Sequence, residues 1–379
     1  MKVVNRVILC GLFSVLASVG GAFYAAAQVV VPASDLAIYY GGRWDRHRAA
    51  VAETGRGAAY VRTGFNGSEV GVALTNESVW WSYSIDGAPL KRFRPAGKMT
   101  VLASGLRPGA HELFLIRETE GNGANSEFSG VVLADGGTLS KTAVSNRRLE
   151  FIGDSISAGA WDRGMGDYVD QQDGSMAFGP QLARLLKAEY MVTATSGEGV
   201  MLNYSERRDS TVKSVHAPSD YVRMFRDAAK PAWNFKQFQP QAVIIAFGTN
   251  DFTDPEQAPT QEEFQRAYTR LIRLVRANNP QAAISCMEPL PAWLGEPVWV
   301  SIEKAVATVT RGGDHKVYFL ALNDVKPLLA PADYADGSTH PLVAGQTKLA
   351  LNLQHRVAAL LGWDREKVYV PQAFLDKIV

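Results

Sequence analysis

The chain has 379 residues, which is enough for one large domain or two domains of ordinary size. Hydrophobic residues make up 46% and charged residues 20%, values typical of a globular protein. The 39 Lys and Arg residues nearly balance the 38 Asp and Glu residues, so charge indicates no preference for nucleic acid or for an anionic membrane. We therefore expect a small or uncharged partner and no nucleic acid.

Residues 1–27 have the order of a secretory signal peptide. Lys2 and Arg6 precede an apolar stretch at 7–23, and three alanines end the segment at position 27. A retained membrane anchor is the alternative, but a small-residue site directly after the stretch favours cleavage near position 27. We expect a protein that is secreted or periplasmic, with no membrane span after cleavage.

The two cysteines do not predict a disulfide in the mature protein. Cys10 lies within the predicted signal peptide, which leaves Cys286 without a partner in the same chain. Because Cys286 lies in an apolar run, we expect it to be a small buried hydrophobic residue.

Residues 28–146 have the pattern of an antiparallel β-sandwich of the jelly-roll kind. Asn66-Gly67, Asp86-Gly87 and Pro108-Gly109 are among the turn signals that recur at regular spacing, and no helical periodicity interrupts them. The strands that we expect between the turns are 59–62, 70–74, 79–85, 113–116 and 131–133.

Residues 147–379 show strand–helix alternation and predict a three-layer α/β/α domain. Apolar residues recur at helical spacing over 264–275, with Thr260 and Glu263 placed for a capping box, and a final helix is expected over 349–360. Continuous apolar strands between such helices predict a parallel sheet covered on both faces. The expected strands are 149–152, 190–194, 242–247, 282–287 and 317–322.

Polar clusters follow these strands, and ligands of such sheets bind beyond the carboxyl ends of the strands. Ser155, in a Gly-Asp-Ser run, can present its hydroxyl as a nucleophile. Asn250, in a Gly-Thr-Asn-Asp run, can donate a hydrogen bond to an oxyanion. His340, just before the last helix, can accept the serine proton as general base. Taken alone, the serine and asparagine clusters are equally consistent with a turn or a helix cap.

A fourth cluster follows the strand expected at 190–194. There Gly197, in a Ser-Gly-Glu-Gly run, would let a backbone N–H approach an oxyanion closely, although a simple turn explains the run as well. No His, Cys or Asp cluster has metal-ligand spacing and no loop has a phosphate-binding pattern, so we expect no metal and no cofactor.

The order of the four clusters resembles the four sequence blocks of the SGNH (GDSL-type) hydrolase superfamily. With a signal peptide and a β-sandwich ahead of it, the layout is similar to carbohydrate esterase family 2, bacterial enzymes that remove acetyl groups from xylan and related plant polysaccharides. Phe65-Asn66-Gly67, the segment 106–120 and Gly248-Thr249-Asn250-Asp251-Phe252 support the likeness. It implies Ser155 as nucleophile and His340 as base. It also implies an oxyanion hole made by the N–H groups of Ser155 and Gly197 with the Asn250 side chain.

One departure from the superfamily concerns the residue that orients the histidine. The superfamily normally has an Asp two or three residues earlier, but here Ser338 and Gly337 occupy those positions, and the nearest acid is Asp336. Either Asp336 reaches His340 from one position further away, or a backbone carbonyl orients the ring in a Ser–His dyad.

Two tryptophans are candidates for contacts with substrate. Trp293 and Trp299 flank a loop with Pro and Gly after the strand expected at 282–287, where an indole can stack on a sugar ring. Ordinary core or rim packing is the alternative. Asp154 and Asp251 are expected to support their turns and not to touch substrate.

The resemblance predicts a serine esterase that hydrolyses acetyl esters on a plant polysaccharide through an acyl-enzyme. A different ester, such as a lipid acyl, sialate or peptidoglycan ester, is an alternative within enzymes. A carbohydrate-binding protein with a vestigial site is the alternative outside them, and the intact Ser155, Asn250 and His340 argue against it. The sequence does not fix the polysaccharide, the preferred hydroxyl or the oligomeric state.

Overall fold

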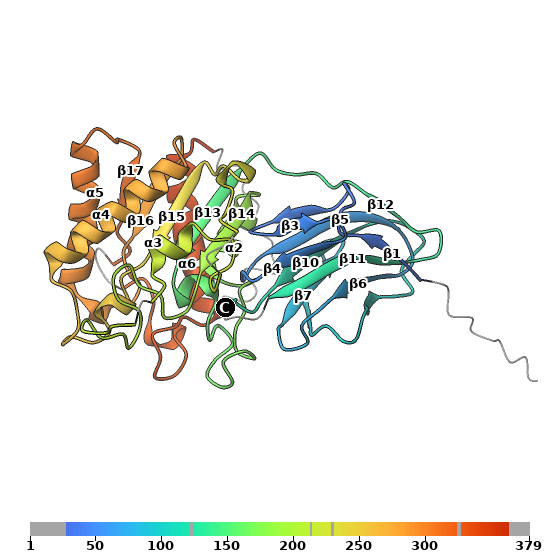
Figure 1. The fold of residues 1–379 in the computed structure, drawn as a ribbon, viewed down its shortest axis with the longest axis horizontal. Coiled ribbons are helices and arrows are strands. Elements are labelled where there is room, and N and C mark those ends of the chain that lie inside the picture. The colour runs from blue at the N-terminus through green and yellow to red at the C-terminus, as the bar shows by residue number, and fades with distance from the viewer. Residues whose placement is uncertain (1–27, 122–124, 213, 229–230, 324–326, 364–379) are drawn as a thin grey trace, which may run out of the picture.

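The computed structural model describes residues 28–121, 125–212, 214–228, 231–323 and 327–363. An antiparallel β domain and an α/β domain lie side by side (Figure 1). The predicted signal peptide lies outside the described residues. Within those residues, no helix is both long enough and apolar enough to cross a membrane.

The first domain is the predicted β-sandwich, which the structure confirms. One sheet has the order β3-β4-β11-β6-β9 with β1 beside β11, and the other has β12-β5-β10-β7-β8 with β2 beside β5. Trp44, Trp81 and Phe128 are buried in the core between them. The strands are β1 Gln28–Pro32, β2 Tyr39–Gly41, β3 Asp45–Arg48, β4 Val51–Thr54, β5 Tyr60–Gly67, β6 Val70–Leu74, β7 Trp81–Ile85, β8 Lys91–Phe93, β9 Thr100–Ala103, β10 Gly109–Arg117, β11 Ser126–Ala134 and β12 Thr138–Ser140.

The second domain contains the predicted parallel sheet, in the order β14-β13-β15-β16-β17. Its strands are β13 Arg148–Gly153, β14 Glu189–Ala194, β15 Ala242–Ala246, β16 Ala283–Met287 and β17 Val317–Leu320. The helices are α1 Ser155–Ala158, α2 Phe178–Leu185, α3 Ala217–Tyr221, α4 Gln261–Asn278, α5 Glu296–Arg311 and α6 Val343–Leu360. Short 3₁₀ turns are η1 Phe235–Gln237, η2 Asn250–Phe252, η3 Ala292–Leu294 and η4 Pro331–Asp333.

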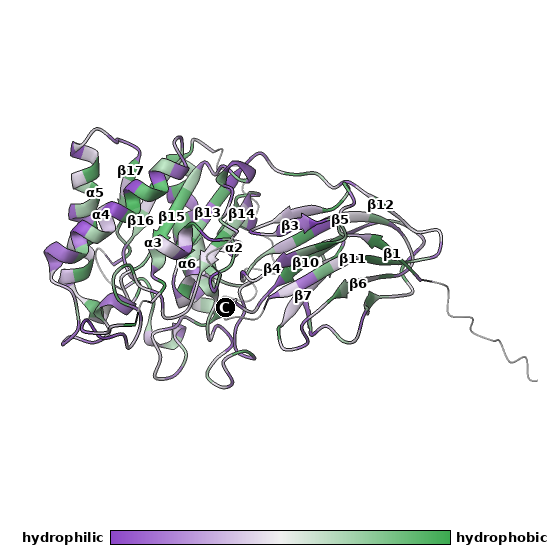
Figure 2. Cartoon of the chain, in the orientation of Figure 1, coloured by the Kyte–Doolittle hydropathy of each residue, from purple (hydrophilic) through white to green (hydrophobic). Residues whose placement is uncertain are grey.

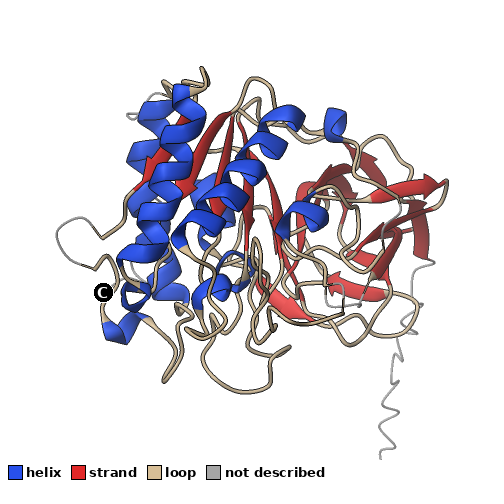
Figure 3. Cartoon of the chain, turned by 60° about the vertical axis from the view of Figure 1, so that its left-hand side comes forward, coloured by secondary structure: helices blue, strands red, loops and turns tan. Residues whose placement is uncertain are grey.

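Helices cover both faces of this sheet, as predicted (Figure 3). Successive side chains of a strand point to opposite faces, so Phe151 packs with α2 and α6 while Ile152 packs with α4 and α5. The strands of this sheet are mostly hydrophobic, although β13 and β14 each contain a Glu, and the helices carry hydrophilic residues among their hydrophobic ones (Figure 2). The predicted capping box is also present: Thr260 Oγ1 accepts the Glu263 N–H, and the Glu263 carboxylate accepts the Thr260 N–H.

The two domains share a hydrophobic core. Tyr60 from β5 is fully buried against Tyr190 from β14, with ring centroids 4.6 Å apart, and its hydroxyl donates to Glu189 at 2.5 Å. A buried ion pair also crosses the interface, because Arg56 of the sandwich makes two hydrogen bonds, of 2.7 and 2.9 Å, to the Asp220 carboxylate.

The topology of the parallel sheet brings three loops together. From β13 the chain crosses to β14 on one side and then returns to β15 on the other. Gly153, the last residue of β13, pairs with Ala194 on one side and with Ala246 on the other, so all three strands end at the same level. This reversal of strand order is where open α/β sheets bind their ligands.

Candidate active site

The predicted nucleophile starts a helix of a single turn. Asp154 caps this helix through a hydrogen bond from the Ile156 N–H to its carboxylate at 3.0 Å, and burial raises the pKa of Asp154 to about 7. A Cβ atom on Gly153 would lie 2.1 Å from Ser157 Oγ and 2.9 Å from Ala246 O, so only glycine fits before the cap. Ser155 follows this cap directly and so lies at the carboxyl end of β13.

His340 lies next to this serine. Its Nε2 atom is 2.8 Å from Ser155 Oγ, a hydrogen-bonding distance across 185 positions of sequence. Its Nδ1 atom is 2.7 Å from Ser338 Oγ, and the same hydroxyl oxygen accepts the main-chain N–H of His340 at 3.1 Å. Burial lowers the pKa of His340 to about 4, which favours the neutral imidazole.

A tight turn explains why Asp336 lies apart from His340. The Ser338 N–H donates to Ala335 O at 2.9 Å, and Gly337 has φ +64° in the left-handed region. Asp336 stands at the corner of this turn and is exposed to solvent. The group next to Nδ1 of His340 is therefore the Ser338 hydroxyl and not the Asp336 carboxylate.

The oxyanion residues predicted from sequence lie in the loops after β14 and β15. Gly197 has φ +77°, a conformation that favours glycine, and its carbonyl accepts the Tyr204 N–H at 2.7 Å. Asn250, on η2, donates one side-chain N–H to Glu198 O at 2.8 Å, which leaves the other N–H of the amide available. The N–H groups of Ser155 and Gly197 have no acceptor among the described residues.

Asp251 joins these two loops. Its carboxylate accepts the main-chain N–H groups of Val200, Met201 and Leu202, at 3.0, 2.7 and 3.1 Å. Three such bonds fix the loop after β14 against the loop after β15. The contacts agree with the structural role predicted for Asp251.

Sequence reasoning missed an aromatic contact to His340. The Trp161 ring lies 4.7 Å from the His340 ring and 4.8 Å from that of Tyr168. Trp161 has φ +53°, an uncommon conformation for a bulky residue and one that is often found at functional sites. The sequence offered one signal for this contact: Trp161 follows Ser155 by six residues, just after the short helix α1.

The two tryptophans predicted to contact substrate differ in their surroundings. Trp293 is on η3, after the carboxyl end of β16, and its side chain is 57% exposed. Trp299 lies inside α5 and is half-buried, because the helix begins at Glu296, where the sequence indicated a loop. Tyr204, 61% exposed, is a further aromatic residue at this edge of the sheet.

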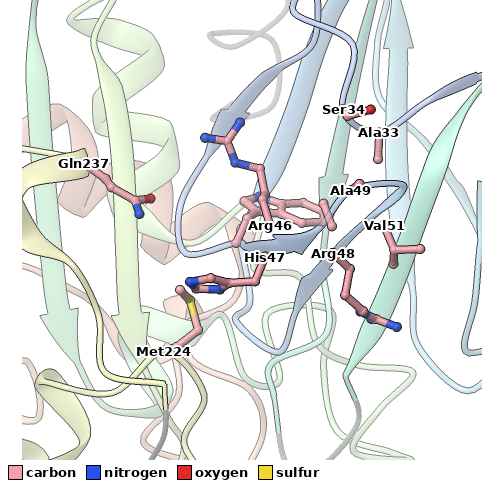
Figure 4. Close-up of a pocket in the computed structure, with 11 residues that line it drawn as sticks. Ala33, Ser34, Arg46, His47, Arg48, Ala49, Val51, Met224 and Gln237 are labelled. Atoms are coloured by element: carbon pink, nitrogen blue, oxygen red, sulfur yellow. The ribbon is translucent and has the colours of Figure 1, made fainter.

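A hollow of about 330 Å³ lies elsewhere, where the β3–β4 hairpin meets the α/β domain (Figure 4). Arg46, His47 and Arg48 of the sandwich and Met224 and Gln237 of the second domain are among its lining residues. None of the predicted site residues lines it. In the described part of the chain, no group of three His, Cys, Asp or Glu residues is arranged to hold a metal ion.

Sequence comparisons identify both domains. The profile of the GDSL-like Lipase/Acylhydrolase family matches residues 151–348, and the profile named Carbohydrate esterase 2 N-terminal matches residues 40–142. Fold and site thus define a GDSL-type acylhydrolase. The chain belongs to that family. Its N-terminal domain matches that of the family 2 carbohydrate esterases, and the relatives and solved structures that it resembles are carbohydrate esterases.

Two curated relatives are informative. The cellulase/esterase CelE of Acetivibrio thermocellus is 30% identical over 344 residues, which cover 86% of this chain but only 40% of that protein. An acetylxylan esterase / glucomannan deacetylase of Cellvibrio japonicus is 27% identical over 78% of this chain and 82% of its own length. This chain thus spans less than half of the first relative and most of the second.

Solved structures show the same arrangement. A family two carbohydrate esterase from Clostridium thermocellum, in complex with cellohexaose, has a TM-score of 0.78 at 28% identity and covers 86% of this chain and 100% of its own. A family two carbohydrate esterase from Cellvibrio japonicus has a TM-score of 0.78 at 22% identity, over 89% of this chain and 99% of its own, and it shows the fold alone.

Proposed function

We propose that this protein is an exported carbohydrate O-deacetylase that hydrolyses acetyl esters on plant polysaccharides through a Ser155 acyl-enzyme. The observation that carries the proposal is the 2.8 Å distance between Ser155 Oγ and His340 Nε2 at the switch point of the sheet. Acetylated polysaccharide as substrate rests on the relative from Cellvibrio japonicus. Export rests on the signal-like order of residues 1–27.

The tautomer of His340 follows from the acceptors around Ser338. The Ser338 oxygen already accepts the His340 main-chain N–H, and its second lone pair can accept a proton from Nδ1. With the proton on Nδ1, the Nε2 lone pair is free to take the Ser155 proton. Ser338 thus does the orienting that the superfamily assigns to an acid, with Asp336 outside the site.

The reaction then has two steps. Ser155 Oγ attacks the acetyl carbon as its proton moves to Nε2, and the sugar oxygen leaves with that proton. Water then attacks the acyl-enzyme with His340 as base, which releases acetate and restores the serine. The N–H groups of Ser155 and Gly197 with the Asn250 amide stabilise the oxyanion of each step, at about 3 kcal/mol for each donor.

Acetate release from acetylated xylan, acetylated glucomannan and a chromogenic acetate tests the proposal, with longer acyl esters for comparison. Ser155→Ala should lower kcat by a factor on the order of 10⁴ or more, because the nucleophile is gone. Ser157→Ala is the matched control: it is a buried serine two positions away whose hydroxyl has no partner in the described structure, and it should stay active.

Three results would contradict the proposal. Full activity in Ser155→Ala would remove the mechanism. Faster turnover of long acyl chains than of acetyl esters would remove the substrate assignment. Binding of the polysaccharide with no hydrolysis by the wild-type protein would favour a binding protein with a vestigial site.

A further inference from the structure

The β-sandwich domain contacts the oxyanion loop through one buried carboxylate. Glu120 lies three residues after β10, and its side chain is 1% exposed. One of its oxygens, Oε2, accepts the main-chain N–H of Ser196 at 2.7 Å. Ser196 directly precedes Gly197, which the proposed function places in the oxyanion hole.

Hydrogen bonds hold the loop on both sides of the Gly197 N–H. Ser196 N–H donates to Glu120 on one side, and on the other side Glu198 N–H donates to Thr195 O at 3.2 Å. The Gly197 N–H itself has no acceptor in the part of the chain that the structure describes. A free donor between fixed peptide groups is the arrangement that an oxyanion hole requires.

The same carboxylate also supports the histidine side of the site. Its other oxygen, Oε1, accepts the Tyr168 hydroxyl, and the Tyr168 ring packs at 4.8 Å against Trp161. Trp161 in turn lies 4.7 Å from the His340 ring. Glu120 thus contacts both the loop that carries Gly197 and the tyrosine that packs on Trp161 beside His340.

Glu120 differs from the other acceptors of this loop because it belongs to the β-sandwich domain. The other acceptors described above for the loop after β14, such as Asp251, belong to the α/β domain itself. Glu120 reaches the loop from the other domain. Burying a carboxylate is costly unless it is hydrogen-bonded, and this one has a main-chain N–H and a phenol as donors.

We propose that Glu120 is a positioning residue for the oxyanion hole, so that the β-sandwich domain takes part in catalysis by fixing the Thr195–Ser196 peptide group, next to the one that carries the Gly197 N–H. The inference rests on the proposed function, because it needs Gly197 N–H as an oxyanion donor. Glu120 touches no reacting atom. It acts through the main chain of Ser196.

The matched control is Glu189, another carboxylate between the domains. It is 1% exposed and accepts the Tyr60 hydroxyl at 2.5 Å and an Arg62 N–H at 2.8 Å. Glu189 begins β14, whereas Ser196 follows the other end of that strand. Loss of either carboxylate weakens the domain interface, but only loss of Glu120 releases the oxyanion loop.

The experiment compares Glu120→Ala, Glu120→Gln and Glu189→Ala in the full chain. Glu120→Ala should lower kcat for a chromogenic acetate by about 10- to 100-fold with KM within threefold, because a donor displaced by about 1 Å loses most of its effect. Affinity for a boronic acid that mimics the tetrahedral intermediate should fall by the same factor. Glu120→Gln keeps an oxygen acceptor and should stay within threefold of wild type, as should Glu189→Ala.

The inference fails if Glu120→Ala has the kcat of Glu189→Ala, if boronic acid affinity is unchanged, or if Glu120→Gln loses as much as Glu120→Ala. Should Glu120→Ala not fold, Glu120→Asp replaces it, because its shorter side chain retreats from Ser196; unchanged kcat would then overturn the inference. An inactive wild-type protein would instead refute the proposed function, so the two failures are distinguishable.

Discussion

At Nδ1 of His340 the structure places the Ser338 hydroxyl, where a carboxylate would stabilise a positive imidazolium. A neutral partner compensates little for the loss of hydration, and burial lowers the pKa of His340 to about 4. The ring is therefore neutral, and able to accept a proton, down to mildly acidic pH. The driving force for taking that proton is correspondingly smaller than with a charged partner.

The pH dependence of kcat/KM should show this low pKa. Protonated His340 cannot act as base, so activity is lost as the pH falls through the pKa of the ring, near pH 4, and not near the usual 6.5. In Ser338→Asp the new carboxylate should raise that pKa and move the acid limb upward by about 1–2 pH units. Profiles of both proteins that extend well below pH 4 measure the difference.

Asp336→Ala is the control for this prediction. Asp336 is exposed at the corner of its turn, so the variant should keep both the acid limb and kcat of the wild-type protein. A loss near 10⁴-fold in Asp336→Ala would instead indicate a triad with this acid. An acid limb that does not move in Ser338→Asp would show that position 338 does not contact the ring in solution.

The sequence predicted the position of His340 but not the partner of its ring. Spacing limits how far Asp336 can reach, but the direction of its side chain depends on the turn. Gly337 at φ +64° closes that turn with Asp336 on the outside and the Ser338 oxygen on the inside. A side-chain hydroxyl as the orienting group was therefore not among the alternatives that the sequence raised.

At the scale of elements, the sequence predicted those helices and strands that have one buried face and one exposed face. The long helix α4 shows this contrast and was predicted with its cap. Helix α2 has only eight residues, too few to show a repeating apolar pattern over several turns, and the sequence did not predict it. Strand β3 is made of Asp, Arg, His and Arg, three of them exposed, and it carries no apolar signal.

The site depends on where the strands of the parallel sheet end, and less on how long they are. The loops after β13, β14 and β15 meet because Gly153, Ala194 and Ala246 are in register, a fact of pairing that no single strand reveals. The general rule for parallel sheets still predicts that the ends of such strands carry ligands. That is why Ser155, Gly197 and Asn250 could be named before their strands were known to be neighbours.

Gly197→Ala tests whether the loop conformation after β14 matters for catalysis. An added Cβ would meet only the Tyr204 Cβ at 3.5 Å, an ordinary contact, so the cost is backbone strain at φ +77°, about 1–2 kcal/mol. Relaxation of that strain should rotate the Gly197 N–H and lower kcat by at least about tenfold. Steady-state kinetics and urea unfolding measure the two effects.

Gly87→Ala provides the comparison. Gly87 has φ +74° in a turn of the sandwich, with nothing within 4 Å of an added Cβ, so its backbone strain is similar. It should lose similar stability and keep its kcat. Equal kcat in the two variants would mean that the Gly197 N–H has no special role.

At the scale of the whole molecule, the interface between the two domains belongs to a hydrophobic core to which both domains contribute. Tyr60 and Ile116 of the sandwich belong to the same buried cluster as Leu149 and Tyr190 of the α/β domain. Separating the domains would expose these residues together with buried charges. We therefore expect the two domains, which the sequence predicted from its change of periodicity near residue 147, to unfold in a single transition.

Asp220→Ala tests the coupling of the domains. The Arg56 and Asp220 side chains are 2% and 1% exposed, and removing one partner leaves a buried charge unpaired, so the free energy of unfolding should fall by about 3–5 kcal/mol. Arg56→Met with Asp220→Leu removes both charges and should recover most of this loss. Urea unfolding followed by tryptophan fluorescence and circular dichroism gives the values and shows whether the two signals coincide.

The pH dependence of stability gives this prediction a second readout. Burial, the largest single influence, would raise the pKa of Asp220, but Arg56, together with the nearby Arg43 and Arg226, outweighs it and holds the pKa below its usual value. The contribution of the pair is therefore present above the unfolded-state pKa of about 4 and is lost as the pH falls below it. Asp220→Ala should thus differ from wild type most at neutral pH and least in acid. A constant difference across pH, or two separate unfolding transitions in the wild-type protein, would contradict a single cooperative unit joined through this pair.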